Sequence, residues 1–322
     1  MKTKNMHKLF LIAVSVIIFA SCKKESENIF TMFTDVTVTY NNSDPRCVTD
    51  YKLVNDKDEV WIDFTINSAS EDMYSYTIEK SSGTQTPERT TITINDATKR
   101  RSFSDIIKLT MNRDGKTTYR IYALNQKGIF IGDGKKSVTI EVNPSYMVYA
   151  NRDIYLPDSV GKSLPSFFSL RDASGFSYTN AAANSGNIDF GIYRKLASNS
   201  TPTAISYTYN LYSPSVAANP LTVYDISSWA PKRTTKFSAP ITGQATAFLT
   251  GAVSGSTIET LAKARTINLD ATAGTTLVNG LNSGSAVFFL TQEGKYGMIY
   301  INAVTSDYQK RPFINVSIKV QR

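Results

Sequence analysis

Hydrophobic and polar residues alternate along residues 30–143, and this period of two indicates β-strands. The clearest case is the segment VWIDFTI, which places Val60, Ile62, Phe64 and Ile66 on one face of a strand. Asp114-Gly115 predicts a tight hairpin between the strands that flank it. The expected strands are residues 36–40, 60–66, 74–78, 91–94, 107–111, 118–124 and 137–142. Short strands separated by turns in this way predict a β-sandwich.

The pattern changes after Asn143-Pro144, which marks the expected boundary with a second domain, residues 144–322. This half has fewer charged residues, and helical signals interrupt its strands. Ser256-Thr-Ile-Glu259 fits a capping box and predicts a helix at residues 258–264. Strands are expected at residues 166–170, 188–193, 286–290, 296–301 and 313–320, and single helical turns at 181–183 and 225–229. The chain is therefore predicted to be mostly all-β, with two β-sandwich domains in tandem and short helical insertions in the second.

Residues 1–21 have the order of a secretory signal peptide, with lysines, an apolar run and small residues before Cys22. The run is shorter than the roughly twenty apolar residues of a membrane-spanning helix. Ala20-Ser21-Cys22 resembles the end of a bacterial lipoprotein signal, although Phe19 stands where leucine is commonest. The resemblance implies a lipid anchor (palmitate) on Cys22, followed by a tether of residues 22–29. The alternative is ordinary secretion with a chance cysteine.

Charged residues follow Cys22 directly, from Lys23 to Glu27. This arrangement is similar to the export signal of Bacteroidetes lipoproteins. The resemblance implies a location in the outer membrane, anchored by lipid and facing the cell exterior, with the periplasmic face as the alternative.

Two further resemblances concern the domains. Tyr119-Arg-Ile-Tyr-Ala123-Leu-Asn125 resembles the sixth strand of fibronectin type III domains, which implies an immunoglobulin-like fold for residues 30–143. The segments SFFSL (166–170), IDFG (188–191) and GKYGMIYI (294–301) resemble a domain of uncharacterised Bacteroidetes surface lipoproteins. That resemblance implies a location at the cell surface and no defined activity.

Composition removes several classes of chemistry. The only histidine, His7, lies in the signal peptide, so His-based catalytic triads and zinc sites are excluded from the mature chain. Cys47 then has no partner for an intramolecular disulfide, and we expect a buried or half-buried structural residue. No metal, cofactor or catalytic residue is predicted. The basic residues are scattered without interleaved aromatic residues, so nucleic acid is not an expected partner.

The candidate ligand-binding residues are aromatic, because sugar rings stack on exposed aromatic faces. Residues 207–212 (YTYNLY) bring together Tyr207, Tyr209, Asn210 and Tyr212, and Trp229 is expected in a loop. The alternative for these residues is a role in the core. Asp158-Ser159-Val160 matches a short O-glycosylation signal, which makes Ser159 a candidate glycosylation site.

These observations favour a non-catalytic, lipid-anchored outer-membrane protein whose C-terminal domain captures polysaccharide. A first alternative is adhesion, or a subunit of a surface complex that binds a protein partner. A second is a glycoside hydrolase, which needs two carboxylates across a cleft, and the second half offers nine acidic residues.

Overall fold

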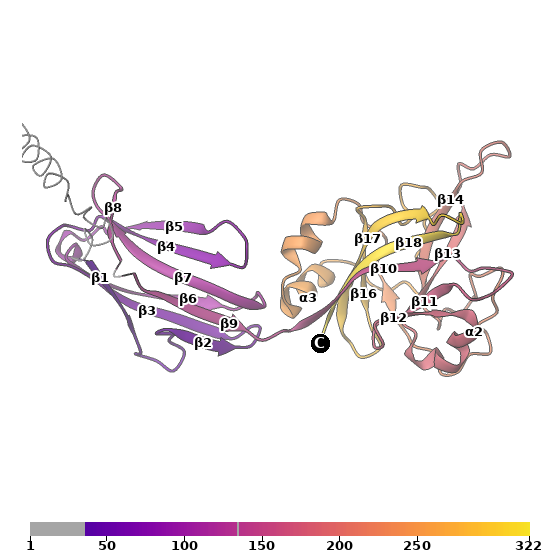
Figure 1. Ribbon diagram of the computed structural model, residues 1–322, viewed down its shortest axis with the longest axis horizontal. Coiled ribbons are helices and arrows are strands. Elements are labelled where there is room, and N and C mark those ends of the chain that lie inside the picture. Colours follow the sequence, from indigo (N-terminus) through magenta and orange to yellow (C-terminus); the bar gives the residue numbers. More distant parts are fainter. Residues whose placement is uncertain (1–35, 134) are drawn as a thin grey trace, which may run out of the picture. The chain divides into compact units, whose positions relative to one another are not determined.

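The computed structural model describes residues 36–133 and 135–322 (Figure 1). The predicted signal peptide, Cys22 and the tether therefore lie outside the described residues. The chain divides into two compact units. Among the described residues, the first consists of those up to Asp50 with Ile62–Ile107 and Thr118–Val138, and the second of Thr139–Arg322 with Tyr51–Trp61 and Lys108–Thr117.

The chain is mostly all-β, as predicted. Its first nine described strands form two sheets, a three-stranded sheet in the order β1-β3-β6 and a six-stranded sheet in the order β2-β9-β7-β4-β5, with β8 paired to β7. The strands are β1 (Val36–Asn41), β2 (Tyr51–Val54), β3 (Glu59–Ser68), β4 (Ser75–Ser82), β5 (Glu88–Thr93), β6 (Ser102–Thr110), β7 (Gly115–Leu124), β8 (Phe130–Gly132) and β9 (Ser137–Val142). A short 3-10 helix, η2 (Ala97–Lys99), precedes β6.

The apolar face predicted for β3 is confirmed, because Val60, Ile62, Phe64 and Ile66 are all fully buried. The hairpin predicted at Asp114-Gly115 is wrong. β6 and β7 lie in different sheets, so this segment crosses from one sheet to the other. Gly115 has φ of +86°, which suits glycine in a crossover as well as in a hairpin.

The remaining strands form a second pair of sheets. One has five strands in the order β10-β18-β17-β16-β15, and the other has four in the order β12-β11-β13-β14. Their bounds are β10 (Tyr146–Tyr155), β11 (Pro165–Ser169), β12 (Ser174–Ser177), β13 (Phe190–Leu196), β14 (Tyr207–Tyr212), β15 (Lys236–Phe237), β16 (Ala286–Leu290), β17 (Tyr296–Ser306) and β18 (Pro312–Gln321).

The main core of this part lies between its two sheets. Side chains from both sheets meet there, among them Phe168, Phe190, Phe289, Ile299 and Ile318, which are at most 1 % exposed. Strands β1–β9 and strands β10–β18 thus form two β-sandwiches in tandem, as predicted.

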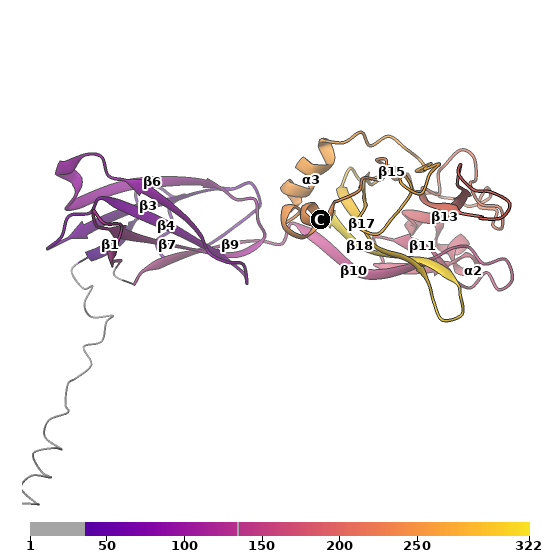
Figure 2. The same cartoon turned by 90° about the horizontal axis from the view of Figure 1, so that it is seen from above.

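Both outer faces of the second sandwich are covered by insertions. On the four-stranded sheet the insertions are α2 (Tyr178–Ala181), η3 (Ala182–Asn187) and the loop that contains Trp229, with Phe167 of β11 beneath them. On the five-stranded sheet they are the π-helical turn η4 (Ala247–Gly251) and α3 (Gly255–Lys263), which lies beside β17 and β18 in Figure 2. The predicted helical insertions thus serve as covers for the sheets.

α3 begins at Gly255, three residues earlier than the predicted helix at residues 258–264. Its N-cap is Ser254, whose hydroxyl oxygen accepts a hydrogen bond from the Thr257 amide. The Thr257 hydroxyl oxygen in turn accepts a hydrogen bond from the Ser254 amide. The capping box predicted from Ser256 and Glu259 is therefore wrong, because threonine takes the place of the expected acid. Within the described residues, no helix has the length and apolarity that crossing a membrane requires.

Candidate functional site

Trp229 is not the exposed platform that the sequence suggested. Its side chain is 6 % exposed and packs in the cluster over the outer face of the four-stranded sheet. The indole ring lies 4.9 Å from the ring of Phe167 and 5.8 Å, stacked, from that of Tyr178. An isolated sheet would leave these side chains exposed, and Trp229 covers them, so little of the indole ring remains accessible to a sugar.

The tyrosine segment, residues 207–212, forms β14 and is largely interior. Tyr212 is fully buried, and Asn210 is fully buried with its amide oxygen accepting the backbone amide of Gly274 at 2.8 Å. Neither can reach a ligand, which corrects the prediction for both. Tyr209 is half-buried against the main core. Tyr207 is half-buried beneath the guanidinium of Arg194, 4.2 Å from its ring centroid.

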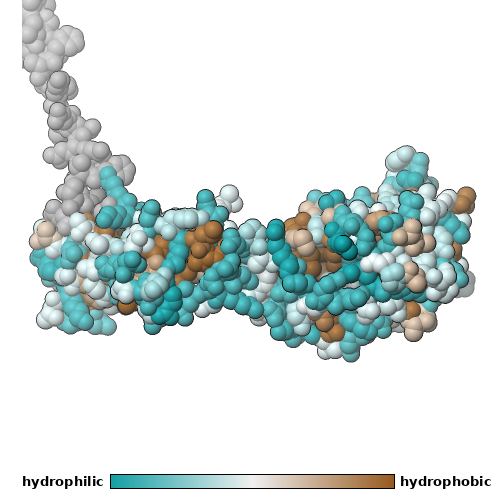
Figure 3. All heavy atoms as spheres, turned by 90° about the horizontal axis from the view of Figure 1, so that it is seen from below, coloured by the Kyte–Doolittle hydropathy of each residue, from teal (hydrophilic) through white to brown (hydrophobic). Residues whose placement is uncertain are grey.

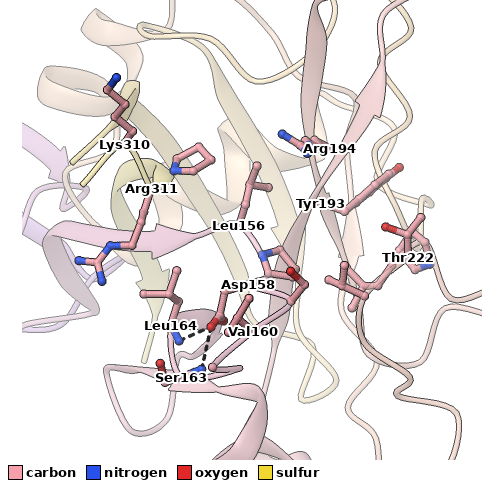
Figure 4. A pocket seen from close by; sticks show the side chains of 17 residues that line it. Leu156, Asp158, Val160, Ser163, Leu164, Tyr193, Arg194, Thr222, Lys310 and Arg311 are labelled. Carbon is pink, nitrogen blue, oxygen red and sulfur yellow. Dashed lines mark hydrogen bonds between the residues drawn. The ribbon is translucent and has the colours of Figure 1, made fainter. Parts of the chain in front are cut away.

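A pocket of about 530 Å³ opens at one end of the second sandwich (Figure 4). Four segments that are far apart in the sequence line it. They are the loop after β10 (residues 156–164), the pair Tyr193-Arg194 of β13, the loop at residues 220–223 and the turn between β17 and β18 at residues 310–312. Pro157, Val160, Leu164 and Val223 supply an apolar lining, and Val160 is 98 % exposed.

The turn between β17 and β18 is held rigid by Asp307. Its carboxylate accepts the backbone amides of Gln309 and Arg311, at 3.0 and 2.9 Å, and pairs with the Arg311 guanidinium at 2.6 Å. Burial raises the pKa of Asp307, but the hydrogen bonds from Arg311 outweigh burial and hold that pKa below its usual range. This scaffold presents Tyr308, which is 89 % exposed, and the exposed side chain of Lys310.

The single carboxylate among the lining residues, Asp158, serves the structure of the pocket. It accepts the hydroxyl of Tyr224 at 2.6 Å and the amides of Ser163 and Leu164 at 3.2 and 3.3 Å. Burial raises the pKa of Asp158, yet the bonds from Tyr224 and the two amides outweigh burial and leave the pKa below its usual range. Figure 4 shows the carboxylate turned towards these amides, which closes the 158–164 loop.

Other acidic residues of the second sandwich are also used structurally. Asp189 is fully buried, accepts the Leu170 amide at 2.7 Å and pairs with Arg233 at 2.8 Å. Burial raises the pKa of Asp189, and the charge of Arg233 opposes this rise. Across residues 36–133 and 135–322, no group of three acidic, cysteine or histidine side chains could hold a metal ion. Cys47 is buried, as expected.

Sequence reasoning did not find the pocket, because its four segments meet only in the fold. One signal was present. Asp307-Tyr-Gln-Lys-Arg311 places an aromatic residue and two cations in a turn between two strongly predicted strands. Ser159, the candidate glycosylation site, is exposed and lines the same pocket, and its modification stays a prediction.

Comparisons with known proteins add little. No protein-family profile and no curated protein matches the chain. Among solved structures, one that is similar in part is the CARDB domain of a Pyrococcus furiosus protein, solved in complex with di-metal ions. It is 10 % identical over 35 % of this chain and 96 % of that chain, with a TM-score of 0.21. A likeness at this level carries no information about function.

Proposed function

We propose that this chain is a lipid-anchored outer-membrane protein, facing the cell exterior, that captures polysaccharide through its C-terminal sandwich without cleaving it. The observation that carries the proposal is the open pocket between the 156–164 loop and the rigid turn at Asp307. Its lining mixes apolar surface with the hydroxyls of Ser159, Ser163 and Thr222. A few polar groups on a largely apolar wall are typical of ligand-binding pockets.

In this proposal Tyr308, in place of Trp229, supplies the aromatic ring on which a sugar stacks. It belongs to the same turn as the lining residues Lys310 and Arg311, and its ring is exposed. A tyrosine on a rigid turn loses little conformational entropy when a sugar stacks on it. The C–H face of a sugar ring would contact the phenol ring, while the pocket would receive the neighbouring residue of the polymer.

A hydrolase would need a general acid that stays protonated near neutral pH. Asp158 has the opposite character, because its hydrogen bonds stabilise the ionised carboxylate. Asp189 has a raised pKa, but it is fully buried and bound to Arg233. The chemistry of these two residues supports binding over hydrolysis.

Native gels cast with single polysaccharides test the proposal on the chain from Lys23 to Arg322. We expect at least one polymer to retard the wild type and Tyr308→Ala to abolish the retardation. Tyr51→Ala is the matched control, because Tyr51 is 52 % exposed on β2 and should leave retardation unchanged. Equal retardation of all three proteins, or none with any polymer, would overturn the proposal.

The anchor is tested separately in cells. Cys22→Ser should move the protein from the membrane fraction to the soluble fraction, because the thiol that carries the lipid is removed. A variant that stays in the membrane fraction would contradict lipid anchoring through Cys22.

Binding to a protein partner is the second candidate, and one observation favours it. Leu196 and Ile205, beside the tip of the β13–β14 hairpin, and Leu277 and Val278 in a nearby loop are all exposed. The backbone joins the hairpin to that loop, with the Ser198 amide 2.7 Å from the Thr275 carbonyl. Exposed apolar residues that gather on neighbouring loops are typical of protein contacts. Figure 3, by contrast, shows small, separate hydrophobic patches on the face that it presents.

A further inference from the structure

The pocket carries an excess of positive charge. Its lining contains Arg194, Lys310 and Arg311, against the single acid Asp158. Resting on the function proposed above, we propose that this pocket selects acidic polysaccharides, polymers whose sugars carry carboxylate or sulfate groups, over neutral ones. The net charge of the second half of the chain favours the same ligands, because residues 144–322 contain fifteen basic and nine acidic residues, an excess of six basic residues.

Two of the three cations are available to a ligand. Arg311 is paired with Asp307, so much of its charge is neutralised within the turn. In the described part of the chain, neither Arg194 nor Lys310 forms an ion pair. Both side chains are exposed. A ligand anion therefore meets Arg194 on one wall of the pocket and Lys310 on another.

Arg194 is also held in place. Its guanidinium lies over the ring of Tyr207 at 4.2 Å, a contact that fixes the side chain and leaves the N–H groups at its edge free to donate. A planar guanidinium with free N–H groups suits a carboxylate or a sulfate, which it can bind through two parallel hydrogen bonds. Tyr207 thus has a role at the site as the support of Arg194.

Asp158 does not cancel this preference. Its carboxylate is surrounded by the Tyr224 hydroxyl and two backbone amides, whose dipoles oppose its charge. Figure 4 shows Asp158 turned into its own loop, with the charged ends of Arg194, Lys310 and Arg311 away from its carboxylate and that of Arg194 nearest to Leu156. The anion-binding groups and the carboxylate therefore occupy different parts of the pocket.

The expected effects are modest, because the two cations are exposed and screened by salt. An exposed charge pair typically changes an affinity by about two- to fivefold. Removing both cations should weaken binding by about fourfold to twenty-fivefold, because free energies that add multiply the affinities. Raising the salt concentration from 50 mM to 500 mM should also weaken binding, because salt screens the attraction between the two cations and the acidic polymer.

The test uses gels cast with polygalacturonate or chondroitin sulfate on one side and dextran or pullulan on the other. Each mobility is normalised to a gel without polymer. The test variant is Arg194→Gln with Lys310→Gln. The control is Lys295→Gln with Arg265→Gln, which removes the same charge from two other exposed positions of the second sandwich. We expect an acidic polymer to retard the wild type and the control, and to lose most of its effect on the test variant.

The outcomes separate this inference from the proposed function. Retardation by neutral polymers alone, abolished by Tyr308→Ala, would overturn acidic selectivity and leave polysaccharide capture intact. Equal weakening in both double variants would show non-specific attraction to a basic protein and overturn the inference. Retardation by no polymer at all would overturn both the inference and the proposed function.

Discussion

Replacing Trp229 by alanine should destabilise the second sandwich rather than remove a binding surface. The indole is 6 % exposed, and aromatic side chains of this kind bury roughly 150–250 Å². At about 25 cal/mol per Å² this area corresponds to about 4–6 kcal/mol as an upper bound. Measured losses for Trp→Ala in cores are about 3–5 kcal/mol. We therefore expect Trp229→Ala to lower the free energy of unfolding by about 3–5 kcal/mol.

Urea unfolding followed by far-UV circular dichroism measures this loss. Trp61→Ala is the matched control. Trp61 is half-buried on the side of β3 opposite its apolar face, with the Lys108 ammonium 4.2 Å from its ring. Its loss should cost no more than about 1 kcal/mol. A Trp229→Ala variant as stable as the wild type would refute the burial argument, and loss of polysaccharide binding in such a stable variant would restore Trp229 as the platform.

Three further predictions concern buried polar groups. Tyr212→Phe should leave the free energy of unfolding unchanged or raise it by up to about 1 kcal/mol, because the Tyr212 hydroxyl is buried without a hydrogen-bond partner among the described residues. Tyr193→Phe should lower it by about 1 kcal/mol, because the hydrogen bond to the Thr272 carbonyl is lost, and the urea midpoints of the two variants test this difference. Arg233→Met should cost about 3–5 kcal/mol in the same assay by leaving the Asp189 carboxylate buried and unpaired, and adding Asp189→Leu should recover most of the loss. Burial lowers the pKa of Lys319 to about 8, so the unfolded chain binds this proton more strongly than the folded chain does. The free energy of unfolding should therefore rise by about 2 kcal/mol between pH 7 and 9.5, and Lys319→Met should not show this rise.

Much of the fold could be predicted because alternation is a local signal. The strand predicted at residues 286–290 has the same bounds as β16, and the apolar face of β3 follows from its sequence alone. β10 was not predicted, since a bulge between Tyr149 and Arg152, with Asn151 at φ of +52°, breaks its alternation. β14 has buried side chains on both faces, and its polar residues Thr208 and Asn210 bond to a loop that lies more than sixty residues away in the sequence. No local pattern reports such a partner.

The candidate site could not be predicted for a related reason. In a sandwich with bare outer sheets, an exposed strand face is a natural place for sugar-binding aromatic residues, and that expectation pointed to Trp229 and residues 207–212. Here the insertions cover both outer faces, so the aromatic residues with large buried surfaces became core. Covering the faces leaves the loop ends as the surface on which ligand-binding groups can gather. Tyr308 and Lys310 lie at such an end, in the turn fixed by Asp307, and Arg194 lies near the end of β13, where its side chain stays exposed over Tyr207.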